Sequence, residues 1–296
     1  MKNKNESLWF ILFAGPAIFS FLVFTAGPMI YSFYLSLCKY NMIEAPQFIG
    51  AENYLYLLRD DPSFWPSVKV TMIYALVQIP LSLIMSLAIA MLLNNQVKAL
   101  GVFRTVYYLP SLLPATSSVI IWVWIFHPNF GLLNNMLAKA GIAEPAWLSS
   151  PHWALPALII MSLWGFGGAM IIFLAGLQNV PRQLYEAAMI DGANSVQRFR
   201  NVTLPMISPV LFFNLVMGII GSMKVFDQAY IFGSMQGSPG GPAQSTLFYV
   251  LNLYQKAFTY FHMGIASSMA WMLFAVTLGL TLVNFRLSKK WVHNDQ

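Results

Sequence analysis

The stretch that decides the fold is YEAAMIDG at residues 185–192, followed by LP at residues 204–205. Between these two motifs, residues 197–201 read QRFRN and carry two arginines. This polar, mixed-charge segment lies between two long apolar segments of the chain. Its composition raises the question of why one part of an otherwise apolar protein is built to contact water or a soluble partner.

The overall composition indicates a membrane protein. Of the 296 residues, 58% are hydrophobic and only 9% are charged, whereas a soluble domain carries about 25% charged residues. The net charge of +6 does not indicate nucleic-acid binding, because no basic run is interleaved with aromatic residues. The single cysteine, Cys38, excludes an internal disulfide and a cysteine metal cluster.

Six apolar segments each reach the length of about 20 residues that a membrane-spanning helix needs. The sequence therefore predicts an all-α membrane protein with one six-helix transmembrane domain over residues 1–296. No small-residue cleavage site follows the first segment, which indicates an uncleaved span rather than a signal peptide. The predicted spans are about 8–37, 68–93, 102–126, 153–178, 205–232 and 264–286.

The basic residues predict the orientation of these spans, because cytoplasmic loops of membrane proteins are enriched in Lys and Arg. With a cytoplasmic N-terminus, the external loops hold only Lys39, Arg59, Lys139 and Lys256, and Lys69 lies at a span edge. We therefore expect both termini to be cytoplasmic. The internal segments then hold Lys2, Lys4, Lys98, Arg104, Arg182, Arg198, Arg200, Arg286, Lys289 and Lys290.

Prolines and glycines occur within or near the predicted spans, and residues 165–168 read GFGG. Such residues favour bent helices that pack closely and enclose a cavity, although ordinary helix packing accounts for most of them. The prolines are Pro28, Pro80, Pro110, Pro114, Pro156 and Pro209.

The opening stretch predicts a short helix over residues 181–191. Pro181 suits the first turn of a helix, and Gly192 suits the position just after its end. At 1.5 Å per residue the helix is roughly 16 Å long, too short to span a bilayer. Its shallow face consists of Leu184, Ala187, Ala188 and Asp191. This face can dock in a groove of a partner or lie at the membrane interface, and the residues alone leave both open.

The spacing of this region resembles the EAA loop of ABC importer permeases. The matching residues are Glu186, Ala187, Ala188, Gly192, Val202, Leu204 and Pro205; the family more often has Ile in place of Val202. Further stretches resemble the carbohydrate-uptake branch, and more narrowly its first, maltose- and lactose-type permease subunit. They are FIGAENY at 48–54, VYYLPSLLPATSSVIIWVWIF at 106–126, KVFDQAYIF at 224–232 and GGPAQSTLFYVLNLYQKAF at 240–258.

The resemblance implies a type I ABC importer permease fold in the bacterial cell membrane. It implies that residues 179–204 form a cytoplasmic coupling loop whose helix contacts an ATPase subunit. The expected partners are a second, related permease subunit, two ATPase subunits and an extracytoplasmic solute-binding protein, which delivers a carbohydrate such as an oligosaccharide. The expected coupling residues are Leu184, Tyr185, Glu186, Ala187, Ala188, Asp191 and Gly192.

No Gly-Lys pair occurs in the chain, so it lacks a phosphate-binding P-loop. We therefore expect ATP and Mg to be bound by the ATPase subunits, with no cofactor and no catalytic residue in this chain. No H-E-x-x-H or G-x-S-x-G motif points to an enzyme either. The prediction is a transport subunit rather than an enzyme.

Lys224 and Asp227 are the charges deepest in the fifth predicted span. At i, i+3 spacing they can pair with each other, or they can line a substrate pathway. The resemblance implies that substrate is held by residues from the middle of spans four to six of one or both permease subunits. The candidate pathway residues are Trp164, Gly165, Gly168, Gly221, Ser222, Lys224, Phe226 and Asp227.

Two alternative functions stay open at this point. One is an ABC importer for a non-sugar such as glycerol-phosphate esters. The other is a gradient-driven carrier, which the lack of a second carboxylate near Asp227 counts against for protons but not for sodium. The aromatic-rich stretch 48–65 is consistent with an interfacial belt or with a surface for the binding protein. The resemblance implies that the turn-rich loop 237–242 lies near that protein, and the alternative is a flexible connector.

Overall fold

The computed structural model describes residues 4–95 and 99–292, with side chains from Trp9 onward. Lys2, Lys98 and the side chain of Lys4, which entered the orientation prediction, lie outside the described residues. Contacts divide the chain into two compact units. Unit 1 comprises the residues up to Pro62 together with Leu253–Ala275, and unit 2 comprises Ser63–Asn252 and the residues from Val276 onward.

Unit 1 begins with a long apolar helix that a π-helical turn interrupts at Leu22–Ala26. A two-residue antiparallel pairing of β1 and β2 follows, with Cys38 opposite Phe48. Helices α15 (Tyr249–Tyr254) and α16 (Met263–Ser288) each contribute residues to both units. The other elements of unit 1 are α1 (Lys4–Phe21), α2 (Gly27–Ser36), β1 (Cys38–Lys39), β2 (Gln47–Phe48), α3 (Glu52–Arg59) and a π-helical turn at Gln255–Thr259.

The C-terminal end of α2 is held by polar side chains from α3 and α16. The Asn53 amide donates to the carbonyl oxygens of Ser36 and Cys38 at 2.9 and 2.8 Å. The Ser268 hydroxyl donates to the Ser36 carbonyl oxygen at 2.8 Å. The last carbonyls of a helix have no partner within the helix. Asn53, within the FIGAENY stretch, therefore supplies hydrogen bonds that the end of α2 requires.

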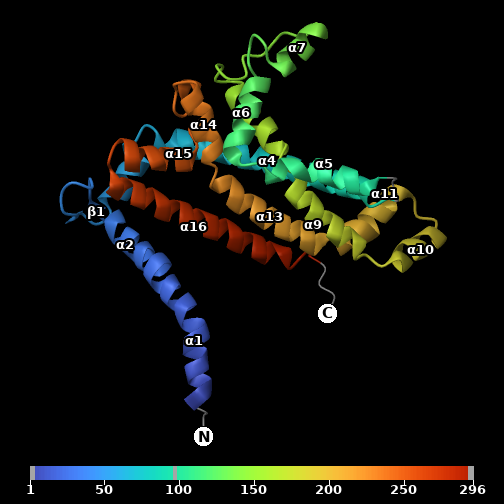
Figure 1. The fold of residues 1–296 in the computed structure, drawn as a ribbon, viewed down its shortest axis with the longest axis horizontal. Helices are drawn as coiled ribbons and strands as arrows, with labels where there is room; N and C mark the ends of the chain where they lie inside the picture. The colour runs from blue at the N-terminus through green and yellow to red at the C-terminus, as the bar shows by residue number, and fades with distance from the viewer. Residues whose placement is uncertain (1–3, 96–98, 293–296) are drawn as a thin grey trace. The chain divides into compact units, whose positions relative to one another are not determined.

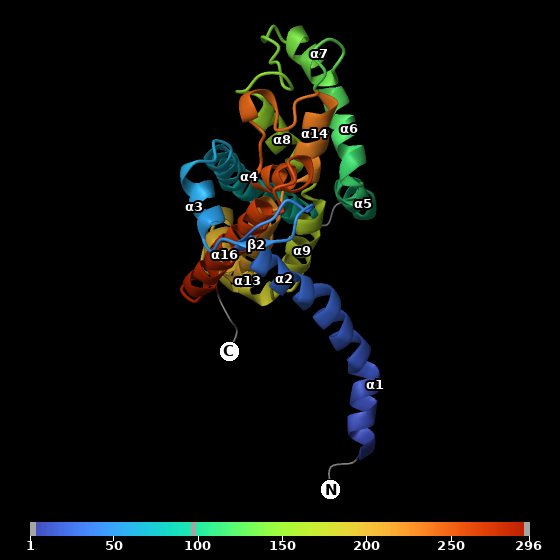
Figure 2. The same cartoon turned by 90° about the vertical axis from the view of Figure 1, so that its left-hand side faces the viewer.

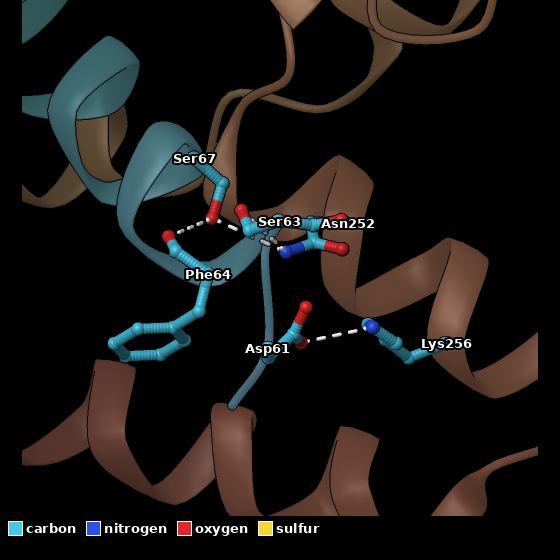
Figure 3. A network of polar contacts seen from close by, with 6 residues as sticks. All are labelled: Asp61, Ser63, Phe64, Ser67, Asn252 and Lys256. Atoms are coloured by element: carbon cyan, nitrogen blue, oxygen red, sulfur yellow. Dashed lines mark hydrogen bonds and ion pairs between the residues drawn. The ribbon is translucent and has the colours of Figure 1, made fainter. Parts of the chain in front are cut away.

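A buried ion pair joins the loop before α4 to the π-helical turn at Gln255–Thr259 (Figure 3). The Lys256 Nζ lies 2.9 Å from the Asp61 Oδ2, and the two side chains are 11% and 0% exposed. Both residues belong to unit 1. Because both charges are largely removed from water, loss of either partner would leave the other as an unpaired buried charge.

Unit 2 is built around three helices that pack side by side, namely α4 (Phe64–Leu93), α9 (Gly167–Gln178) and α13 (Ser208–Met223) (Figure 1). A Cβ on Gly176 would lie 2.8 Å from the Val210 side chain, so the small residue lets α9 approach α13 closely. The remaining helices are α5 (Leu100–Leu112), α6 (Ala115–Ile125), α7 (Leu132–Lys139), α8 (Ala154–Leu163), α10 (Arg182–Ile190), α11 (Ser195–Arg198), α12 (Leu204–Met206), α14 (Asp227–Met235) and a 3₁₀ turn at Pro242–Gln244.

Two apolar cores stabilise unit 2. One gathers Phe126, Leu158, Phe232 and Phe248. The other gathers Met170, Phe173, Leu177 and Ile207. We call the second the α9 core, since three of these four residues lie on α9. Polar contacts also tie α15 to the start of α4: the Asn252 amide donates to the Ser67 hydroxyl at 3.3 Å (Figure 3).

Within the described residues, four helical segments are long and apolar enough to cross a membrane, and two bent pairs raise the total to six. Leu100–Leu112 and Ala115–Ile125 meet at 100°, and Ala154–Leu163 and Gly167–Gln178 meet at 43°. Pro114 and Gly165 lie at these two bends, which agrees with the general expectation of bent spans, whereas Pro80, Pro110 and Pro156 lie inside helices. The four segments are Trp9–Ser36, Phe64–Leu93, Ser208–Met235 and Met263–Ser288.

The Asp61–Lys256 pair generates a stability prediction. Replacing Lys256→Met leaves the Asp61 carboxylate buried without its counter-ion, which costs about 3–5 kcal/mol. Combining it with Asp61→Asn removes the charge and recovers most of that loss. Thermal unfolding of the purified protein in detergent measures both variants. Lys139→Met, at an exposed position of α7, is the control; a Lys256→Met variant as stable as this control would contradict the prediction.

Candidate functional site

Helix α10 is close to the predicted short helix and is one residue shorter at each end. Pro181 is the residue just before the helix rather than part of its first turn. At the other end, Ala193 N–H donates to the Ala188 carbonyl at 2.9 Å and Gly192 N–H donates to the Met189 carbonyl at 3.1 Å. This pair of bonds is a Schellman motif, which needs a left-handed residue. Gly192 supplies it with a φ of +78°, as its predicted position required.

The chain then returns to the bundle through three short helical pieces. Asn194 and Gln197 form a reciprocal capping box at the start of α11, with bonds of 2.9 and 2.8 Å. A π-helical turn over Phe199–Thr203 follows, in which Leu204 N–H donates to the Phe199 carbonyl. Pro205, the second residue of the LP motif, cannot donate such a bond. The motif therefore marks the point where the π-helical turn gives way to α12 and α13.

Tyr185 anchors α10 to unit 2. Its hydroxyl lies 3.0 Å from the Thr203 hydroxyl, and Thr203 is buried. Its ring packs against the α9 core together with Val202 and Met206. Tyr185, which the sequence placed among the ATPase contacts, thus points toward the bundle.

The outward surface of α10 and α11 is more apolar than the sequence indicated. Of the predicted coupling residues, Leu184, Glu186, Ala187, Asp191 and Gly192 are exposed, and Ala188 is half-buried. Sequence reasoning missed three exposed apolar side chains. These are Met189 (51% exposed), Ile190 (87%) and Val196 (73%). They lie outside the helix face counted from Leu184. The signal for Met189 and Ile190 is a bulky apolar pair directly before the Asp-Gly helix end, and Val196 in α11 has no such signal.

Helix α7 projects at the top of Figure 1 and α10 lies at its right-hand side, so the two are well separated within unit 2. Figure 2 shows α7 at the end of α6 that points away from α9 and α13. This position separates the exposed apolar surface of α10 from the loop between α6 and α8. The helices between α7 and α10 contain the second group of predicted site residues.

Lys224 and Asp227 do not share one helix face, contrary to the expectation of a continuous span over 205–232. Helix α13 ends at Met223 and α14 begins at Asp227, with Phe226 at φ −137° and ψ −63°. No proline or glycine at 224–226 signals this break in the sequence. In the part of the chain that the structure describes, no ion pair joins the two side chains. Lys224 instead lies at the C-terminal end of α13 and Asp227 at the N-terminal end of α14, where the helix dipoles favour their charges.

The break opens onto a pocket of about 390 Å³, which we call the Lys224 pocket. Six of the predicted pathway residues line it: Gly165, Gly221, Ser222, Lys224, Phe226 and Asp227. Trp164 and Gly168 do not, and Trp164 packs edge-on against Trp122 with ring centroids 5.9 Å apart. Gly218, Val225 and Gln228, which belong to or adjoin the same predicted stretch, also line the pocket, and the lining residues that sequence reasoning missed are Tyr74, Gln78, Ala115 and Ser162.

The left-handed residue at the end of α10 allows a direct test of the helix geometry. Gly192→Ala places a Cβ on a residue at positive φ and should weaken the Schellman motif by roughly 1 kcal/mol. Hydrogen–deuterium exchange of the amides around Ala188–Ala193 should become faster. Gly279→Ala is the matched control, because Gly279 lies inside α16 with open space around it. Equal protection in Gly192→Ala and the wild type would show that the motif is not what ends the helix.

Comparison with known proteins identifies the family. Residues 78–291 match the family described as "Binding-protein-dependent transport system inner membrane component". The chain is 43% identical over 294 residues to the "Probable ABC transporter permease protein YesP" of Bacillus subtilis (strain 168), covering 99% of this chain and 94% of that protein. It is 38% identical over 281 residues to the lactose transport system permease protein LacF of Rhizobium radiobacter, covering 93% and 91%.

The fold is also similar to a solved structure. A chain in the crystal structure of a bacterial alginate ABC transporter, in complex with its alginate pentasaccharide-bound periplasmic protein, superposes with a TM-score of 0.82. The match covers 98% of this chain and 96% of that chain at 23% identity. With the family match and the candidate membrane helices, this fold identifies a multi-pass membrane protein of the type I importer architecture. The chain belongs to the binding-protein-dependent transport system inner membrane components and is a permease subunit of an ABC importer.

Proposed function

We propose that this permease subunit imports a carbohydrate, an oligosaccharide or related sugar, delivered by an extracytoplasmic solute-binding protein. The lactose permease LacF, which is 38% identical, supports this substrate class. The Lys224 pocket supports it independently, because its lining combines hydroxyl, amide, ammonium and carboxylate groups with the aromatic ring of Phe226. Sugars are bound by hydrogen-bonding groups next to apolar or aromatic surfaces.

Helix α10 is the proposed contact with an ATPase subunit, and its geometry is the observation that carries the coupling role. Tyr185 ties the inward side of α10 to Thr203 and the α9 core. The outward side presents Met189 and Ile190, which are 51% and 87% exposed. An amphipathic helix of this kind fits an apolar groove on a partner. Arg182, Arg198 and Arg200 in the same loop favour the cytoplasmic side, so both termini are proposed to be cytoplasmic.

The proposed mechanism uses α10 as a rigid connection. The loaded binding protein docks outside, and ATP closes two ATPase subunits beneath this chain and a second, related permease subunit. Tyr185 joins α10 to Thr203 in the π-helical turn that leads through α12 into α13. Movement of α10 is therefore transmitted to a helix that lines the pocket. ATP and Mg are bound by the ATPase subunits, and this chain contributes no catalytic residue.

The substrate class is tested with the complete assembly in proteoliposomes. ATP hydrolysis stimulated by the binding protein is measured with a panel of oligosaccharides and, as the non-sugar comparison, sn-glycerol phosphate. Stimulation by a saccharide supports the proposal, and stimulation by the phosphate ester alone overturns the substrate class. Uptake driven by an ion gradient without ATP would contradict the importer mechanism itself.

The coupling role of α10 yields a matched pair of variants. Ile190→Glu places a charge on the proposed docking surface and should lower binding-protein-stimulated ATP hydrolysis at least about tenfold. Its fold should be unchanged, because Ile190 is 87% exposed. Ile43→Glu is the control, since Ile43 is equally exposed but lies in the loop between β1 and β2. Equal activity of the two variants would remove Ile190 from the ATPase contact.

A further inference from the structure

A second pocket, of about 300 Å³, lies along α4, α9 and α13. We call it the Asn214 pocket. Its residues from α4 are Gln78, Ile79, Ser82 and Leu83, and its residues from α13 are Phe213, Asn214, Met217 and Gly218. The Lys224 pocket uses the adjoining parts of the same helices, with Tyr74 and Gln78 from α4 and the residues from Gly218 onward. The two pockets therefore follow one another along α4 and α13.

Gln78 and Gly218 are the residues that both pockets share. Gln78 lies at the middle of α4, which runs from Phe64 to Leu93. Its amide makes no side-chain hydrogen bond to any residue that the structure describes, so both its donor and its acceptor are available. Gly218 adds no side chain on the α13 side, where a Cβ would meet Ile79 at 3.4 Å. Where the two pockets meet, α4 therefore contributes the Gln78 amide, and α13 contributes Gly218, which has no side chain.

Both pockets carry polar side chains, although most of the residues that line the Asn214 pocket are apolar. Ser82 and Asn214 extend the polar lining into the Asn214 pocket, and Ser222, Lys224 and Asp227 line the Lys224 pocket. Polar groups in the middle of membrane helices are costly in hydrocarbon and generally face a cavity or another helix. The two adjoining pockets lie along one pair of helices, and Gln78 is the polar residue that lines both of them.

We propose that Gln78 and Gly218 form the junction of a single translocation groove, at which a hydroxyl-bearing substrate passes between the Lys224 pocket and the Asn214 pocket. The Gln78 amide donates to one substrate hydroxyl and accepts from another as the substrate passes, because an amide offers both functions. A Cβ at Gly218 would already be in van der Waals contact with Ile79 of α4, so a larger side chain there would crowd the junction. The substrate class rests on the proposed function, whereas the continuity of the groove does not.

The continuity of the groove is tested by cysteine labelling, which requires neither sugar nor ATP. Ser82→Cys and Ser222→Cys report on the Asn214 pocket and the Lys224 pocket respectively. The complete assembly in sealed proteoliposomes is treated from one side with the membrane-impermeant cation trimethylammonioethyl methanethiosulfonate. Native Cys38 is buried and sets the background rate. Leu76→Cys is the lipid-facing control on α4, since Leu76 is 74% exposed and lines neither pocket.

We expect reagent added from the open side to label both pocket cysteines, and to label Leu76→Cys at least about tenfold more slowly, because a charged reagent does not enter hydrocarbon. Adding Gly218→Leu should leave labelling of the nearer pocket unchanged and slow labelling of the farther pocket by a similar factor. Gly279→Leu, on an open helix surface, should change neither rate. Gly218→Ala, whose Cβ the structure accommodates, should give an intermediate rate if the larger variant fails to assemble.

Two results would overturn the junction. One is labelling of Leu76→Cys as fast as of Ser82→Cys, which would place the pockets toward the outside of the bundle. The other is fast labelling of both pockets in the Gly218→Leu variant. Neither result depends on which solute is imported, so a wrong substrate class leaves this test unaffected, and the sugar-stimulated ATPase assay decides the substrate class separately.

Discussion

The constraint on which this structure depends is that a membrane offers no hydrogen-bond partner to a broken helix. Where a helix is interrupted at membrane depth, its free backbone groups must be satisfied by protein or must line a cavity. Among the residues of unit 2 that the structure describes, apolar helices are interrupted after Leu112, around Gly165 and at Lys224–Phe226. Tight turns provide hydrogen bonds for some of these free backbone groups. The Gly165 N–H donates to the Ser162 carbonyl, and the Lys224 N–H donates to the Gly221 carbonyl. The Ser86 hydroxyl also reaches the Phe166 carbonyl at 3.2 Å.

All three interruptions contribute to the same pocket. Ala115 is the first residue of the helix after the first break, Gly165 lies in the second, and Lys224–Phe226 form the third; each of these lines the Lys224 pocket. Breaks spread at random over the spans would have no reason to meet in this way. Their meeting point explains why the prolines and glycines of this chain are compatible with a membrane, and it gives the pocket a lining of backbone as well as side chains.

The sequence predicted those features that a local residue type determines. Gly192 ends α10 because the left-handed position there excludes most side chains, and Pro114 and Gly165 mark bends because they weaken a helix locally. It did not predict the break at Lys224–Phe226, which has no such residue, nor the direction of Tyr185, which is set by Thr203 and the α9 core. Gln78 was missed for a similar reason. Its proposed role arises because it lines both pockets together with Gly218 of another helix, and spacing within one segment cannot show that.

The charges of the Lys224 pocket follow from the same break. Had α13 continued through Asp227, Lys224 and Asp227 would have been one turn apart, and pairing would have consumed both. The break places each at a helix end whose dipole favours it by about 0.3–1 kcal/mol, rising to about 2 kcal/mol when partly buried. That is less than the several kcal/mol needed to remove an ion from water. The charges are therefore stable only in a pocket that holds water or a polar ligand, and both are exposed enough to meet one. A sugar pathway requires the same arrangement, because unpaired polar groups are free to exchange water for substrate hydroxyls.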